Sequence, residues 1–282
     1  MTHSKVRAAS RLSLFLLITS GLLPFYLLSY PFGRGARRAM SWPFYRACIA
    51  LTGLSLRVSG TQAGPGTFFV ANHISYLDIP VIAVLVDGLF VAKAEVQSWP
   101  LFGFLARITR TVFVSRNMSK VAKERLKIAG SLADGESVIL FPEGSSSDGS
   151  RLLPFRPGLL SAAKAASDLS VRVQPVTITY GPAGKTGNAF TQQDRDRYAW
   201  YGDMELASHL WGVFGLKQGA IVSVHFHAPR TSDEFKDARA LAAWAEKTVS
   251  ERIRRQLGAA TEMPEKTSIP TYDAGALKTS AP

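Results

Sequence analysis

The chain has 282 residues, a formal net charge of +12 and one cysteine, Cys48. This length accommodates one α/β domain with an appendage, and a single cysteine excludes an intramolecular disulfide. Residues 1–77 contain no Asp or Glu, and their basic residues flank apolar sequence. Such residues are attracted to anionic lipid, whereas a nucleic-acid partner would call for a basic face of exposed polar residues. We therefore expect a membrane surface as partner and no nucleic acid.

The first 58 residues are predicted to associate with a membrane. Leu12 to Gly33 is a run of 22 residues without a charge, long enough to cross a hydrocarbon core as a helix. Pro24 interrupts this run, no signal-peptide cleavage pattern follows, and Arg residues lie on both sides, so the charges give no clear orientation. A second apolar segment, Trp42 to Leu56, comes next. We predict two anchoring helices that lie in one leaflet, with a true membrane span as the alternative.

From residue 59 onward, short apolar strands alternate with helices. The predicted strands are 67–71, 89–92, 111–114, 138–141, 171–180 and 221–227, and the predicted helices are 77–85, 99–108, 118–132, 158–167 and 233–257. This alternation predicts an α/β fold over residues 59–258, in which a mostly parallel twisted sheet has helices on both faces. The tail, residues 259–282, is rich in Thr, Ser, Pro and Lys and is predicted to be disordered.

His73 and Asp78 follow the predicted strand 67–71 and are separated by four residues. Imidazole can accept and return a proton near neutral pH, and a carboxylate on its second nitrogen fixes the tautomer. The chain has no Gly-x-Ser-x-Gly sequence to supply a nucleophilic serine. The pair therefore suits an enzyme whose nucleophile is a hydroxyl group of the substrate. The alternative is a structural histidine at a strand end, because this spacing also arises by chance.

Three further segments give the pair a context. Phe141-Pro142-Glu143-Gly144-Ser145 follows an apolar run, Thr111 to Arg116 precedes it, and Val173-Gln174-Pro175-Val176 comes later. In this order, and together with the His73 segment, they resemble the four blocks of the glycerolipid acyltransferases, the PlsC-like family. The resemblance covers about residues 60–230 and is most specific in the first and third blocks.

The resemblance implies roles for five residues. In that family the histidine is the general base, the aspartate orients it, and the Glu-Gly block helps to bind the acceptor. These roles fall on His73 and Asp78 as the catalytic pair, and on Glu143, Gly144 and Ser145 as acceptor-binding residues. The turns that carry them are expected at the carboxyl edge of the sheet, where ligands bind in α/β folds.

Two cations outside the third block are further candidates for substrate binding. Arg116 matches the basic residue that follows the second block of the family, and Lys93 could contact an anion. For each, the alternative is a solvated surface charge.

The chain also departs from the family pattern. Ser146 stands where the third block usually has arginine, and Arg110 stands where the second block usually has glycine. Loss of a fixed guanidinium removes a bidentate contact to phosphate. Residues 147–155 and 198–204, with His209-Leu210-Trp211, resemble the bacterial lyso-ornithine lipid acyltransferase branch. The aromatic pair Trp200-Tyr201 is interpreted either as an acceptor contact or as a hydrophobic plug on the sheet.

We therefore expect a membrane-associated O-acyltransferase of lipid biosynthesis. Its acceptor hydroxyl, deprotonated by His73, attacks the thioester of an acyl carrier protein or coenzyme A. Lyso-ornithine lipid is the expected acceptor and lysophosphatidic acid the alternative. We expect no metal and no bound cofactor, since His225 and His227 have no carboxylate or thiol at ligand spacing. The expected location is the cytoplasmic side of the inner membrane. A peripheral lipid-binding protein with a structural His73 is the non-enzymatic alternative, and a lipid esterase is disfavoured.

Overall fold

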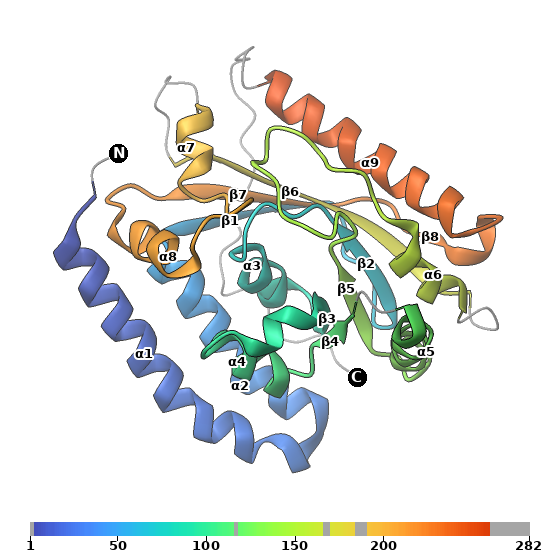
Figure 1. Ribbon diagram of the computed structural model, residues 1–282, viewed down its shortest axis with the longest axis horizontal. Helices are drawn as coiled ribbons and strands as arrows, with labels where there is room; N and C mark the ends of the chain where they lie inside the picture. Colours follow the sequence, from blue (N-terminus) through green and yellow to red (C-terminus); the bar gives the residue numbers. More distant parts are fainter. Residues whose placement is uncertain (1–2, 116–117, 166–169, 184–190, 260–282) are drawn as a thin grey trace.

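The computed structural model describes residues 3–115, 118–165, 170–183 and 191–259. These residues form an eight-stranded sheet in the order β1-β7-β6-β2-β5-β3-β4, with β8 paired to β6 (Figure 1). The strands are β1 Leu54–Ser59, β2 Thr67–Ala71, β3 Gly88–Lys93, β4 Val112–Val114, β5 Ser137–Leu140, β6 Arg172–Pro182, β7 Ala220–Phe226 and β8 Arg230–Thr231. The pairs from β6 through β2, β5 and β3 to β4 are parallel, whereas β7 and β8 run antiparallel to β6. The predicted α/β fold with a mostly parallel sheet is confirmed.

Helices cover both faces of the sheet. One face carries α1 Lys5–Leu28, α2 Gly33–Leu51, α3 Asp78–Leu85 and α8 Leu206–Gly215, and the other carries α5 Met118–Ala133, α6 Pro157–Ala165 and α9 Ala238–Ala259. The short helices are η1 Tyr30–Phe32, η2 Ala94–Ser98, α4 Phe102–Ile108, α7 Gln192–Asp196 and η3 Ser232–Glu234. Three predicted helices differ from the observed ones. The helix predicted as 99–108 begins only at Phe102, and the one predicted as 233–257 begins only at Ala238. Of the helix predicted as 158–167, residues 166–167 lie outside the described residues.

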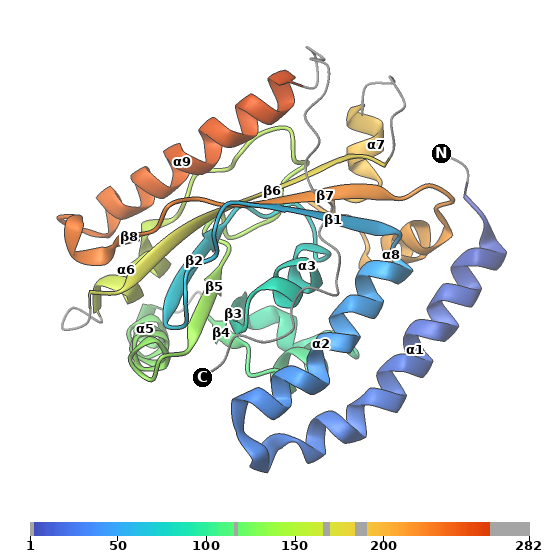
Figure 2. The ribbon, with the colours of Figure 1, turned by 180° about the vertical axis from the view of Figure 1, so that it is seen from behind.

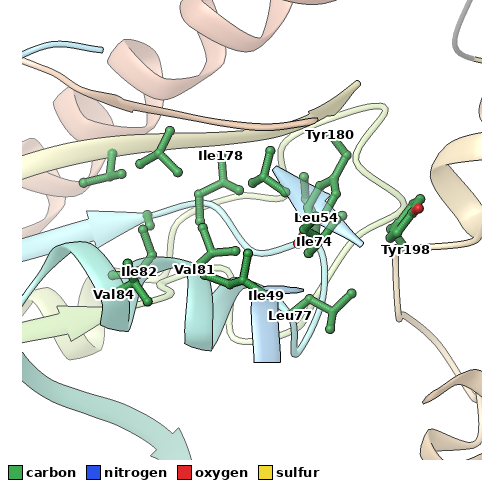
Figure 3. Packing of buried hydrophobic residues seen from close by; sticks show 14 of the residues in the cluster. Ile49, Leu54, Ile74, Leu77, Val81, Ile82, Val84, Ile178, Tyr180 and Tyr198 are labelled. Atoms are coloured by element: carbon green, nitrogen blue, oxygen red, sulfur yellow. The ribbon is translucent and has the colours of Figure 1, made fainter. Parts of the chain in front are cut away.

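Two buried clusters hold these layers together. Every residue of β2 is buried, because its alternate side chains face the α3 side and the α9 side of the sheet. This explains why its sequence is one continuous apolar run. On the α3 side, Val81 and Ile82 pack against Ile178 of β6, as Figure 3 shows, and Tyr180 and Tyr198 lie at one end of the same cluster. Burial on this scale fixes α3, and with it the loop that precedes it.

The N-terminal segment forms two helices packed against the domain. Figure 2 shows α1 and α2 running side by side along one flank. Near the start of α1, Arg11 donates to the carbonyls of Phe214 and Leu216, each at 3.1 Å, and near its end Tyr26 donates to the carbonyl of Ile108 at 3.1 Å. The outward side chains of α1 are apolar and exposed, among them Val6, Leu17, Phe25 and Leu28. By length and composition this helix could cross a membrane, and it supports membrane association.

The prediction of a helix from Trp42 to Leu56 is wrong at both ends, since α2 already begins at Gly33. Helix α2 stops at Leu51, and Leu54 begins β1, which pairs in parallel with β7. Gly53 makes the change of direction possible with a φ of 72°, a conformation that glycine adopts at low cost. The sheet thus begins within the last residues assigned to the anchor. The predicted disordered tail falls on residues 259–282, of which 260–282 lie outside the described residues.

Candidate active site

His73 lies in the loop after β2, Asp78 is the first residue of α3, and the two meet at the carboxyl edge of the sheet. His73 Nδ1 lies 2.9 Å from Asp78 Oδ2, the Asp78 side chain is fully buried, and the His73 side chain is 18% exposed. An ionised carboxylate can only accept hydrogen bonds, so the imidazole carries its proton on Nδ1. The other ring nitrogen, Nε2, is then free to accept a proton from a substrate.

Three further donors surround the Asp78 carboxylate. The backbone N–H groups of Ile74 and Ser75 donate to Oδ2 at 2.7 and 2.9 Å, and the Tyr180 hydroxyl donates to Oδ1 at 2.7 Å. Burial, and then the charge of Asp78, hold the pKa of Tyr180 well above its ordinary value, which keeps the hydroxyl a donor. The carboxylate is therefore fixed in position on both oxygens. This arrangement orients the His73 ring.

Glu143 links the histidine loop to the segment that follows β5. Its Oε1 accepts the N–H of His73 at 2.6 Å, and its Oε2 accepts the N–H of Leu153 at 2.8 Å. The residue is only 2% exposed. Burial raises the pKa of Glu143 to about 7, against the opposing effect of the two amide donors. Both carboxylate oxygens are thus occupied by the protein itself, and the predicted contact of Glu143 with the acceptor stays a prediction.

The turn from Phe141 to Gly144 packs against the ring of His73. The rings of Phe141 and His73 stack with centroids 4.2 Å apart and an angle of 17° between their planes. The Gly144 N–H closes the turn on the carbonyl of Phe141 at 3.2 Å. Gly144 has a φ of 70°, and a Cβ there would lie 3.2 Å from Nε of Arg156. Glycine is required both for this backbone conformation and for the close approach of the Arg156 side chain.

The remaining predicted substrate-binding residues are dispersed. Ser145 is exposed beside Gly144, and Lys93 is exposed at the end of β3. Arg116 lies outside the described residues. The structure thus brings His73, Asp78, Glu143 and Gly144 together and leaves Lys93 and Ser145 on the surface nearby.

Ser146 points into the protein. It is 8% exposed, and its hydroxyl donates to the carbonyl of Trp200. The N–H of Trp200 in turn donates to the carbonyl of Ile74 at 3.0 Å, inside the histidine loop. The Trp200 ring packs edge-on against Tyr76 and Trp99. The aromatic segment around Trp200 is therefore hydrogen-bonded both to the loop that carries His73 and to the segment that follows Glu143.

Sequence reasoning missed Tyr180, Phe141 and Arg156. Tyr180 lies on β6, 102 residues from Asp78, and only the pairing of β6 with β2 brings it to the site. Its one signal was the alternation that places it on the same face of β6 as the buried Ile178.

The two strand histidines are occupied elsewhere, since His225 contacts Ser59 and His227 contacts Thr177, each at 2.8 Å. Among the described residues, no group of three or more potential ligands could hold a metal ion.

An α/β fold with a carboxylate-oriented imidazole at the carboxyl edge of its sheet is the arrangement expected of an acyltransferase whose substrate supplies the nucleophile. Comparison with known proteins agrees. The family model "Acyltransferase" matches residues 55–179. Lyso-ornithine lipid O-acyltransferase of Brucella abortus is 37% identical over 258 residues, which cover 88% of this chain and 94% of that protein. The Rhizobium meliloti protein of the same name is 36% identical, covering 89% and 86%.

More distant proteins share the fold. The 1-acyl-sn-glycerol-3-phosphate acyltransferase of Neisseria gonorrhoeae is 30% identical over 62% of this chain and 65% of its own length. The crystal structure of the 1-acyl-sn-glycerophosphate acyltransferase PlsC from Thermotoga maritima superimposes with a TM-score of 0.64 at 20% identity, covering 93% of this chain and 96% of that one. This chain belongs to the acyltransferase family, and the resemblance found in its sequence is confirmed.

Proposed function

We propose that this chain acylates the hydroxyl group of lyso-ornithine lipid to form ornithine lipid, with an acyl thioester of acyl carrier protein or coenzyme A as donor and no bound cofactor. The observation that carries this acceptor is the environment of Ser146. Where the family usually has a guanidinium suited to phosphate, a buried serine holds the Trp200 segment against the histidine loop. Similarity to lyso-ornithine lipid O-acyltransferases over nearly their full length gives further support.

The geometry supports a direct transfer with His73 as base. Nε2 of His73 takes the proton of the acceptor hydroxyl, and the oxygen attacks the thioester carbonyl. The C–O bond forms, the C–S bond breaks, and the thiolate takes the proton back from the imidazolium. Asp78 stabilises the imidazolium throughout, held by Tyr180 and two backbone amides. The Gly144 N–H already bonds to Phe141 O, so the developing oxyanion requires another donor.

The N-terminal helices would hold the domain at the membrane that contains the lipid acceptor. Helix α1 is bonded to the domain near both ends, which suits a helix that lies along the membrane surface better than one that leaves the domain to cross it. We propose monotopic attachment to the inner membrane with the catalytic edge on the cytoplasmic side, where acyl thioesters are made. The intact chain should stay with membranes through a high-salt wash, because buried apolar area is insensitive to screening. Release by salt alone would contradict this attachment.

A direct comparison of acceptors tests the proposal. Purified full chain is given one labelled acyl thioester and either lyso-ornithine lipid or lysophosphatidic acid, with His73→Ala as the control for background transfer. The expected result is a higher kcat/KM for lyso-ornithine lipid. Preference for lysophosphatidic acid would favour the second candidate, formation of phosphatidic acid, which the similarity to the Neisseria protein supports. That outcome would reject the acceptor while leaving the catalytic pair in place.

A further inference from the structure

A hollow surface with an excess of positive charge lies next to the catalytic turn, on the α9 side of the sheet. One hollow, of about 350 Å³, is lined by Phe155 and Pro157 and by the outer face of α9. A second, of about 570 Å³, shares Pro157 and Arg239 with it and extends to α5. Neither hollow includes His73. They are joined to the site through the segment that carries Arg156.

That segment is tied to the catalytic turn by two hydrogen bonds and to α9 by a third. Arg156 N donates to the carbonyl of Pro142 at 2.9 Å, and Leu153 N donates to Glu143, the residue that also accepts the N–H of His73. On the other side, Phe155 N donates to Glu246 of α9 at 2.8 Å. The Arg156 guanidinium extends over Gly144. The hollow is thus connected to the turn that carries Glu143 through the hydrogen bonds of this segment.

The cations that line the two hollows outnumber the acidic side chains there. Arg156, Arg239, Lys247 and Arg254 are exposed, and Arg125 has a buried Nε that no described group accepts from. Within the described part of the chain, none of these five side chains forms a salt bridge. The two acids that line the hollows, Glu246 and Asp237, each accept a backbone N–H instead. The net potential of the surface is therefore positive and available to a partner.

We propose that this surface, defined by Arg125, Arg156, Arg239, Lys247 and Arg254, is the docking site for an acidic acyl carrier protein that delivers the thioester. The inference rests on the proposed function. Charge complementarity argues for an acidic partner. Arg239 and Arg254 lie about 22 Å apart along α9, at 1.5 Å per residue. A row of cations of this length fits the surface of a small protein better than the phosphates of a single nucleotide.

The position of the surface also favours a soluble partner over a lipid one. Figure 1 shows α9 on the opposite side of the sheet from α1, the apolar helix. A membrane that receives α1 would lie on the far side of the sheet from the α9 cations. The acceptor and the donor would then approach the catalytic edge from opposite faces of the sheet.

The test uses the full chain in detergent micelles, with palmitoyl acyl carrier protein as donor and the acceptor held constant. Lys247→Glu should raise the KM for the carrier, and Lys247→Glu/Arg254→Glu should raise it at least about tenfold, with kcat at saturation and the KM for the acceptor unchanged. Lys217→Glu is the matched control, since Lys217 is an exposed lysine on the α1 side. Thermal midpoints of all variants should agree.

Direct titration of labelled carrier protein, without turnover, separates this inference from the proposed function. The wild-type chain should bind the carrier with an affinity that falls as salt rises, and the double variant should bind at least about tenfold more weakly. Equal behaviour of Lys247→Glu and Lys217→Glu would overturn the docking site. So would an effect seen only with palmitoyl coenzyme A, which would assign the cations to nucleotide phosphates. Binding that depends on Lys247 in a chain without acyl transfer would support the surface and reject the function.

Discussion

Replacement of Tyr180 by Phe tests whether the buried end of the catalytic pair controls its chemistry. The change removes one hydroxyl that donates to Asp78 Oδ1 at 2.7 Å, in a site where Asp78 is fully buried. His73 and the two backbone amides still hold Oδ2. Orientation of the imidazole is therefore largely kept, while the carboxylate loses the one donor of its second oxygen.

The magnitude follows from the type of bond removed. A hydrogen bond to a charged group contributes about 1.5–3 kcal/mol, so the free energy of unfolding should fall by about 2 kcal/mol. The carboxylate that orients the imidazole is then less firmly held. Since a tenfold change in rate corresponds to about 1.4 kcal/mol and only part of the bond energy reaches His73, kcat/KM should fall by up to about tenfold.

Tyr198→Phe is the matched control. Tyr198 stacks on Tyr180 with centroids 6.0 Å apart, but its hydroxyl donates to the carbonyl of Gln218 at 3.1 Å, away from the pair. This variant should lose a neutral hydrogen bond of about 0.5–1.5 kcal/mol and keep the wild-type kcat/KM. The assay is kcat/KM for acyl transfer at a temperature at which both variants are folded, alongside urea unfolding. Equal values of kcat/KM for the two variants would refute the coupling from Tyr180 through Asp78 to His73.

Three other substitutions have defined outcomes. His73→Ala should lower acyl transfer by at least about 10²–10⁴-fold with the thermal midpoint retained, and residual turnover near wild type would remove the assignment of the base. The raised pKa of Glu143 means that its neutral form favours the folded state. This contribution to the free energy of unfolding is fully present below pH 4.5, the ordinary pKa of Glu, and is lost as pH rises through about 7. Glu143→Gln should remove a decline on the order of 3 kcal/mol from urea unfolding across that window, and an unchanged slope would place the titration elsewhere. Ser146→Arg should lower the thermal midpoint more than Ser146→Ala does, because Ser146 is buried and a guanidinium side chain is much larger than the hydroxyl it replaces. An intact midpoint would contradict this packing.

The sheet could be predicted from sequence wherever burial imposes a clear period. β2 is buried on both faces and appears as a continuous apolar run, and its prediction as 67–71 is confirmed at both ends. β1 was missed although Leu54, Leu56 and Val58 alternate with polar residues, because the apolar segment before it was extended through Leu56 as a helix. Periodicity within a few residues does not decide between a helix end and an edge strand when no proline or charge separates them.

The contact between His73 and Asp78 could be predicted because the two residues are close in sequence. His73 lies in the loop after β2 and Asp78 begins α3, so their contact depends on local geometry and not on the topology of the sheet. Tyr180 and Arg156 reach the site only through the pairing of β6 with β2 and through the return of the chain after β5. Arg110 also depends on a distant contact. Its left-handed backbone, with a φ of 62°, is energetically unfavourable, and its guanidinium donates to both oxygens of Glu136 at 2.6 and 3.1 Å, which offsets that cost.

Two features that the sequence presented separately are one feature in the fold. In the sequence, Ser146 is a departure from the arginine usual in the third block. The aromatic cluster around Trp200 is interpreted separately, as a hydrophobic plug or as an acceptor contact. The Ser146 hydroxyl holds the Trp200 carbonyl, and Trp200 N–H holds Ile74 in the histidine loop. An arginine at position 146 and the Trp200 segment in its present place would compete for the same volume. On the proposed function, selection of the acceptor headgroup would therefore depend on Ser146 and Trp200 together, and we expect that exchange of residue 146 alone does not transfer it between acyltransferases.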